Sequence, residues 1–169
     1  MSELALACGT SKAGLYHYYP SKKALLFDCL ERYTAKLSVL AKSVVAHKHD
    51  PKAQIRSLID AFLNEYSTSR DFHVALLHDV KFLSEAQQNS IKQQERIVVD
   101  FFAQAIQAAF PLTINQQNLK PITMSLLGAM NFTFAWLRDD GTISYRQYAQ
   151  WVAELWLTGL EHGKFPNTL

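Results

Sequence analysis

Hydrophobic residues recur along this chain at alternating spacings of three and four, which is the period of an amphipathic α-helix. Two shorter series span residues 55–66 and 98–110. A third and longest series covers about six turns, at Leu26, Cys29, Tyr33, Leu37, Leu40 and Val44. We find no convincing strand-like alternation of apolar and polar residues, so the pattern predicts an all-α protein.

Residues that cap or break helices mark the expected boundaries. The serines that can act as N-caps are Ser2, Ser11, Ser21, Ser84 and Ser144. Gly9 follows the first short helix, where a left-handed residue commonly ends one, and Pro20 and Pro111 interrupt the chain. Polar segments at 47–51 and 67–71 separate further helices. The eight expected helices cover about 2–8, 11–18, 22–46, 55–66, 72–83, 84–110, 118–137 and 144–161.

Composition supports one packed unit, because 49% of the 169 residues are hydrophobic and only 19% are charged. The net charge is +2, and residues 1–50 hold 7 Lys and Arg against 4 Asp and Glu. This mildly basic end is compatible with nucleic acid. The spacing of Cys8 and Cys29 is not typical of a metal site or of a redox motif. We therefore expect both cysteines to be reduced and to pack against other residues, as in a cytoplasmic protein. The apolar run at 125–137 is too short to span a membrane.

The two short helices near the start, joined by a glycine-containing turn, have the ingredients of a helix-turn-helix. In such a unit the second helix enters the major groove with its N-terminal residues leading. Ser11 and the free amides of the helix start can meet a phosphate, and Lys12 can reach a phosphate or a base edge. Ala13 and Gly14 are small enough for close approach to the bases.

The segment 4–26, LALACGTSKAGLYHYYPSKKALL, resembles the end of the DNA-binding domain of the TetR family of transcriptional regulators. Thr10 departs from the family pattern, and Gly14 is displaced by one position. Segment 136–160 resembles the last two helices of the family's C-terminal domain. The positions that match the family pattern near the start are Ala5, Gly9, Ser11, Leu15, Tyr16, Tyr18, Ser21, Lys22 and Leu25.

This resemblance implies a partial helix-turn-helix (1–21), a connecting helix (22–46) and an effector-binding and dimerisation domain (47–169). It implies a homodimeric, ligand-responsive regulator, most simply a repressor, that is not an enzyme and needs no cofactor. The residues expected to face operator DNA are Thr10, Ser11, Lys12, Ala13, Gly14, Tyr16, His17, Tyr18 and Lys22. Those expected at the dimer interface are Gly128, Trp151, Leu155 and Trp156, with burial inside one subunit as the alternative.

The middle helices are where the family holds its effectors, and here they carry many aromatic residues. We expect a cavity for a small apolar or aromatic molecule, since such pockets are mainly apolar with few polar anchors. The candidate anchors are Asn131, His73 and His78. The full set of candidate lining residues is Phe62, Tyr66, Phe72, His73, Leu76, His78, Phe101, Met124, Asn131 and Phe134.

The family's DNA-binding domain has three helices before the connecting helix, and this chain begins inside the second. Without the covering first helix, Leu4, Leu6 and Leu15 are expected to be exposed and residues up to about Tyr18 loosely held. Either the translation start lies upstream, or the chain is a truncated member. The alternative function is therefore an effector-binding dimeric module that lacks competent DNA binding.

A more remote alternative is a metal-dependent all-α hydrolase. His78 and Asp79 form a His-Asp pair that His47 or His49 and Asp139 could complete. However, His73 and His78 are five residues apart and do not share a helical face. We therefore expect no metal site.

Overall fold

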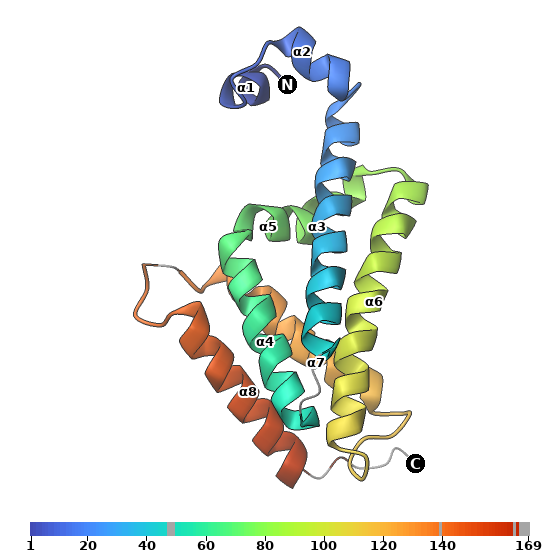
Figure 1. Ribbon diagram of the computed structural model, residues 1–169, viewed down its shortest axis with the longest axis vertical. Helices are drawn as coiled ribbons and strands as arrows, with labels where there is room; N and C mark the ends of the chain where they lie inside the picture. Colours follow the sequence, from blue (N-terminus) through green and yellow to red (C-terminus); the bar gives the residue numbers. More distant parts are fainter. Residues whose placement is uncertain (47–49, 139, 164, 166–169) are drawn as a thin grey trace.

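The computed structural model describes residues 1–46, 50–138, 140–163 and 165, which contain helices and no strand, so the all-α prediction is confirmed (Figure 1). Two 3₁₀ helices, η1 (Val80–Phe82) and η2 (Phe132–Ala135), accompany the α-helices. The α-helices in these ranges are α1 (Ser2–Ala7), α2 (Lys12–Tyr18), α3 (Lys22–Ala46), α4 (Pro51–Thr68), α5 (Arg70–Asp79), α6 (Glu85–Ala109), α7 (Leu119–Asn131) and α8 (Tyr145–His162).

Four of the five predicted serine caps are present. The hydroxyls of Ser11 and Ser21 accept hydrogen bonds from backbone amides three residues later, at 2.9 and 3.1 Å. Ser84 and Ser144 form complete capping boxes, in which the glutamine three residues on bonds back to the serine. Ser2 is not a cap, because α1 begins at Ser2 itself and Met1 holds the N-cap position.

Two predicted boundaries differ from the structure. The polar stretch at 67–71 does not separate two helices by a loop, since α4 continues to Thr68 and α5 starts at Arg70. The helix expected to reach 137 ends at Asn131 and tightens into η2. The Thr133 hydroxyl there donates to the carbonyl of Met130 at 2.8 Å, which satisfies one carbonyl left free at the helix end.

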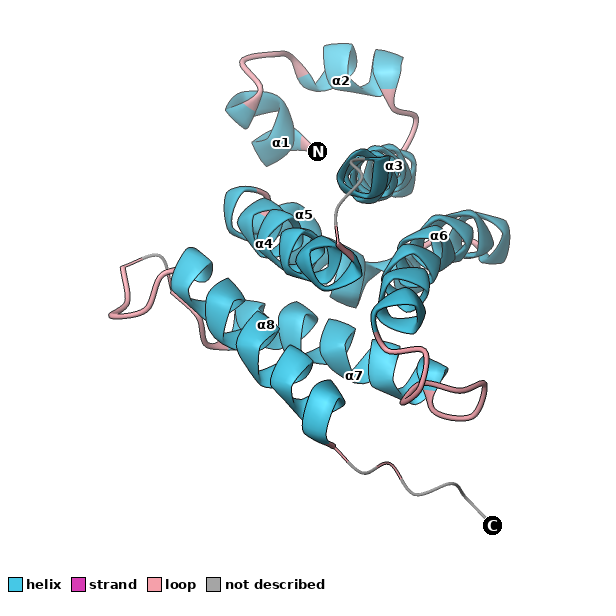
Figure 2. Ribbon diagram, turned by 60° about the horizontal axis from the view of Figure 1, so that its bottom comes forward, coloured by secondary structure: helices cyan, strands magenta, loops and turns pink. Residues whose placement is uncertain are grey.

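The core lies where α3 packs against α4 and α6, and α8 covers the side of α4 away from α3 (Figure 2). α7 completes the bundle beside α6. No described helix combines the length and the hydropathy needed to cross a membrane. The large hydrophobic side chains that are less than 2% exposed are Phe62, Phe102, Leu30, Ile55, Leu58, Ile59, Leu63, Ile91, Ile106, Leu126 and Met130.

Helices α1 and α2 stand apart from the bundle at the N-terminal end of α3 (Figure 1). They share a small cluster of their own, made by Met1, Ala5 and Leu15 with Tyr19 against it. The expectation that Leu15 is exposed is therefore wrong, because α1 covers it. Leu4 and Leu6 are exposed as expected, at 42% and 83%.

We predict that Phe102→Ala lowers the free energy of unfolding by about 3–5 kcal/mol, since it removes a fully buried ring and leaves a cavity. Phe102 meets the Phe62 ring edge-to-face at 5.1 Å. Chemical denaturation measures the change. Phe132→Ala, which removes a ring that is 61% exposed, is the control and should cost less than about 1 kcal/mol. Equal losses in both variants would contradict this assignment of the core.

Candidate nucleic-acid interface and effector cavity

Helix α2 presents most of its side chains to solvent. Lys12, Ala13, Tyr16, His17 and Tyr18 are all exposed, and only Leu15 points into the cluster with α1. Thr10 and Ser11 before the helix and Lys22 after it are exposed as well. The residues predicted to face DNA therefore lie at one end of the molecule, and the bundle does not cover them.

The local packing of α2 favours a residue without a side chain at Gly14. A Cβ atom at this position would lie 2.8 Å from the Thr10 hydroxyl oxygen and 3.2 Å from that of Ser11. The Ser11 hydroxyl sits there because it caps the helix through the Gly14 amide. The small residue predicted for close approach to bases thus has a second reason to be glycine.

A hydrogen-bonded triad joins the end of α2 to the start of α3. The Tyr19 hydroxyl donates to Oδ2 of Asp28 at 2.8 Å, and Nε of Arg32 donates to Oδ1 at 3.0 Å. These bonds, first that of Tyr19 and then that of Arg32, lower the pKa of Asp28. The triad, with Pro20 and Ser21 as the short connection, holds α2 in a defined orientation relative to α3.

A cavity with a volume of about 740 Å³ lies among α3, α4, α5, α6 and α7. Thr34 and Leu37 of α3 form one wall, and Leu127 of α7 faces the cavity from another helix. Tyr66 and His73 also border it and are buried. Its size and largely apolar lining are those of a small-molecule site.

His73 is the most unusual residue of this cavity. Its ring is 2% exposed and stacks on the Tyr66 ring at a centroid distance of 3.7 Å. Neither ring nitrogen has a hydrogen-bond partner with good geometry. Desolvation lowers the pKa of His73 to about 4, and a hydrogen-bond contact of less favourable geometry with the Asn131 backbone raises it by a smaller amount. The imidazole is therefore neutral at pH 7, with one donor and one acceptor nitrogen.

Tyr66 and Asn131 form a polar pair beside His73. The Tyr66 hydroxyl donates to Oδ1 of Asn131 at 3.0 Å, which fixes the amide at the C-terminal end of α7. Burial, with a smaller effect of Glu95, raises the pKa of Tyr66, so the phenol stays protonated and remains a donor.

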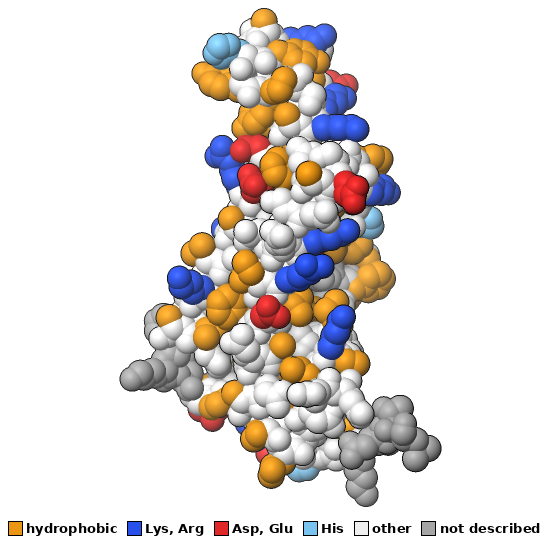
Figure 3. Space-filling model, turned by 90° about the vertical axis from the view of Figure 1, so that its right-hand side faces the viewer, with side chains coloured by type: hydrophobic (Ala, Val, Ile, Leu, Met, Phe, Trp, Pro, Cys, Tyr) orange, Lys and Arg blue, Asp and Glu red, His pale blue; other side chains and the backbone are white. Residues whose placement is uncertain are grey.

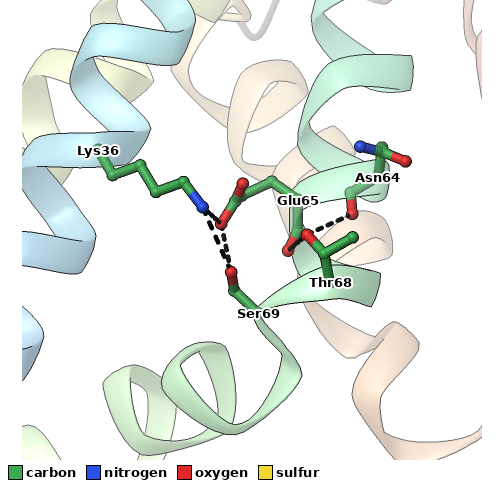
Figure 4. Close-up of polar contacts among 5 residues, drawn as sticks. All are labelled: Lys36, Asn64, Glu65, Thr68 and Ser69. Atoms are coloured by element: carbon green, nitrogen blue, oxygen red, sulfur yellow. Dashed lines mark hydrogen bonds and ion pairs between the residues drawn. The ribbon is translucent and has the colours of Figure 1, made fainter.

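A buried carboxylate connects α3 to the α4–α5 corner (Figure 4). Oε1 of Glu65 accepts hydrogen bonds from Lys36 Nζ at 2.7 Å and from the Ser69 hydroxyl at 2.5 Å. Glu65 is 8% exposed, whereas Lys36 extends into solvent. Because Glu65 precedes Tyr66, this contact sets the position of α3 against the wall of the cavity.

The structure brings five predicted lining residues to the cavity and places the other five elsewhere. Tyr66, His73, Leu76, Met124 and Asn131 border it. Phe62 is fully buried in the core, and Phe101 packs against the core. Phe72 borders a separate small apolar cavity together with Leu4 and Cys29. His78 is exposed, and its ring meets the Phe134 ring edge-on at a centroid distance of 5.2 Å. The helical period marks inward faces but not which inward residues border empty space.

The cavity also has polar lining residues that the sequence did not single out. Lys92 and Arg96 lie one turn apart on α6, and Lys120 lies on α7. Glu95 and Asp100 belong to the same stretch of α6. In the sequence these positions look like the solvated face of an ordinary amphipathic helix, so no local signal distinguished them.

The described residues hold no group of three or more His, Cys, Asp or Glu side chains that could bind a metal ion. His47, His49 and Asp139, which the hydrolase alternative needs, lie outside the described residues. Of the remaining pair, His78 is exposed and Asp79 is half-buried.

Three of the four residues expected at a dimer interface are exposed. Trp151 and Leu155 lie one turn apart on α8 and are 53% and 74% exposed. Gly128 of α7 has open space around it. Trp156 instead packs against the core of its own chain, which is the alternative considered for it.

An exposed two-helix head at one end of a helical bundle is the architecture of a helix-turn-helix regulator. Residues 1–29 match the family model of the bacterial regulatory proteins of the TetR family, and residues 48–160 match that of the tetracyclin repressor-like C-terminal domain. The chain belongs to the TetR family of transcriptional regulators, whose members bind DNA and are not enzymes. No curated protein matches the sequence significantly.

Solved structures of other regulators share this fold. A TetR-family regulator from Bordetella parapertussis is 30% identical, with a TM-score of 0.86 over 92% of this chain and 82% of that chain. PfmR from Thermus thermophilus is 23% identical, with a TM-score of 0.85 over 95% and 88%. AibR, solved with isovaleryl coenzyme A and operator DNA, is 24% identical, with a TM-score of 0.78 over 91% and 84%.

We predict that His73 makes the protein less stable as the pH falls from 6.5 towards 4. Its folded-state pKa of about 4 lies below the ordinary 6.5, so in this window the unfolded chain binds a proton that the folded chain does not. The effect is on the order of 3 kcal/mol. Denaturation at pH 7, 6, 5 and 4 should show a steeper loss in wild type than in His73→Phe.

The carboxylates with lowered pKa values, Asp28 and Glu161, also lose stabilisation in acid, but they are present in both proteins. Parallel stability curves for wild type and His73→Phe would contradict a neutral, desolvated His73.

Proposed function

We propose that this chain is a ligand-responsive repressor that binds operator DNA as a homodimer in the cytoplasm, and that an effector in the cavity controls DNA binding. One observation supports this most directly: the same helix, α3, carries the exposed head at one end and a wall of the cavity further along. Its 25 residues correspond to about 37 Å of continuous helix. A rotation of α3 at the cavity therefore moves α2.

Contacts at its start and in its middle make α3 suitable for this role. At its start, the Tyr19–Asp28 hydrogen bond fixes α2 to it. In its middle, the Lys36–Glu65 ion pair holds it to α4 (Figure 4). An effector that contacts Leu37 would act on α3 directly, and the coupling would equal its difference in affinity between the two positions of the helix.

Dimerisation would place two copies of α2 at one side of the assembly. A two-fold dimer reads successive major grooves when its recognition helices are about 34–36 Å apart, so a change in their separation releases DNA. The exposed face of α8 with Trp151 and Leu155, together with the open position Gly128 on α7, is the surface we assign to the partner copy.

We predict that Lys22→Ala weakens binding of the chain to DNA from upstream of its own gene and reduces the salt dependence of log K by about 1, because a phosphate contact is lost. Lys22 is exposed beside the head. Gel shifts at several salt concentrations measure both quantities. Lys42→Ala removes an exposed charge near the far end of α3 and should change neither.

Wild-type protein that retains no DNA specifically would contradict the proposed regulator. Equal losses in Lys22→Ala and Lys42→Ala would show instead that only the overall charge matters and that the head does not read DNA.

We predict that Leu155→Glu converts a dimer into a monomer, because it places a charge in the apolar centre of the proposed interface. Sedimentation velocity measures the mass. Leu112→Glu is the control, since Leu112 is fully exposed in the loop after α6 and lies outside that face. A wild-type monomer, or a Leu155→Glu variant that stays dimeric, would argue against the assigned surface.

A further inference from the structure

The effector cavity combines cationic side chains with a hydrogen-bonding group that lacks a partner. Lys92, Arg96 and Lys120 border it, and none of them makes a hydrogen bond or an ion pair with a described residue. The side of the molecule formed by α6 shows Lys and Arg side chains among hydrophobic ones (Figure 3). These three cations are exposed to solvent, so they form the rim of the cavity.

Two acidic residues share this rim and reduce its positive charge without cancelling it. Asp100 is exposed, and Glu95 is half-buried. Burial raises the pKa of Glu95 against a smaller opposing effect of Lys92, so its carboxylate is poorly solvated. Three cations against two carboxylates leave the rim positive, and the cations come from both α6 and α7.

Inside the rim, the lining is mainly apolar, and its polar residues include the Tyr66–Asn131 pair, in which Asn131 is half-buried, and the buried residues His73, Thr34 and Thr123. Leu37, Leu76 and Leu127 come from three different helices and enclose space suited to a hydrocarbon body. His73 differs from its polar neighbours because neither of its nitrogens makes a well-formed hydrogen bond although the residue is only 2% exposed. A buried polar group without a good partner is destabilising, so the cavity favours a ligand that supplies one.

We infer that the effector is an amphipathic anion: its acidic group binds Lys92, Arg96 and Lys120 at the rim, its apolar body fills the cavity, and an oxygen in its buried part hydrogen-bonds to His73. This inference rests on the proposed function and replaces the simple apolar effector expected from the sequence. The acidic group stays at the rim because burying an unpaired charge is far costlier than leaving it hydrated.

Three ten-carbon probes separate the parts of this inference. Decanoate carries only the acid, 10-hydroxydecanoate adds an oxygen at the far end, and 1-decanol carries no charge. Titration calorimetry on the full chain should give decanoate about tenfold tighter binding than 1-decanol. The hydroxyl should add a further gain of about threefold to tenfold in affinity.

Two variants assign these preferences to residues. Arg96→Gln should reduce the preference for decanoate over 1-decanol and leave the gain from the hydroxyl intact. His73→Phe should abolish the gain from the hydroxyl and leave the preference for the acid intact. Lys42→Gln, a change of charge on α3 outside the cavity, is the matched control and should alter neither.

Equal binding of decanoate and 1-decanol, or an acid preference that survives Arg96→Gln and Lys120→Gln together, would overturn the inference. So would an unchanged gain from the hydroxyl in both His73→Phe and His73→Gln. Gel shifts of the ligand-free protein test the regulator separately. If the ligand-free protein binds DNA specifically but shows no preference for decanoate over 1-decanol, only the inferred class of effector is contradicted. If the ligand-free protein does not bind DNA specifically, the proposed regulatory function is contradicted.

Discussion

The burial of one face of α3 is the constraint on which the rest of the structure depends. Leu30, Tyr33, Leu37 and Ala41 are at most 5% exposed and pack where α4 and α6 meet. Close-packed interiors tolerate small changes of position poorly. The packing of this face therefore sets the orientation of the whole helix, and with it the orientation of the exposed head. The cavity borders the same face, so in the proposed function recognition of DNA and recognition of a ligand would share one rigid element.

Polar groups are few along this face, and each has a distinct effect. Lys36 and Glu65 give a single ionic contact between α3 and the α4–α5 corner. The hydrogen bond from the Tyr19 hydroxyl to Asp28 joins the end of α2 to α3. His73 and Tyr33 are the exceptions among the described residues, because their buried polar side-chain atoms make no well-formed hydrogen bond. Of the two, His73 borders the cavity, where a ligand could supply the missing partner.

Local signals explain why most of the helices could be predicted. A serine cap and a helical period act within one or two turns, and this was enough at Ser11, Ser21, Ser84 and Ser144. The predictions failed where distant residues decide. Leu15 is covered because α1 folds back over α2. The helix expected to reach 137 stops at Asn131, whose side chain bonds to Tyr66 of α4.

The sequence alone determined the helical class, the family resemblance and the exposed residues of α2, since these depend on neighbours within a few turns. Tertiary structure alone decided the cavity. His73, Lys92 and Lys120 come from three helices, and a helical period indicates which face turns inward but not whether it meets another side chain or empty space. The same reason separates Trp156 from Trp151: both lie on α8, and only the packing of α8 against the other helices decides which ring is covered.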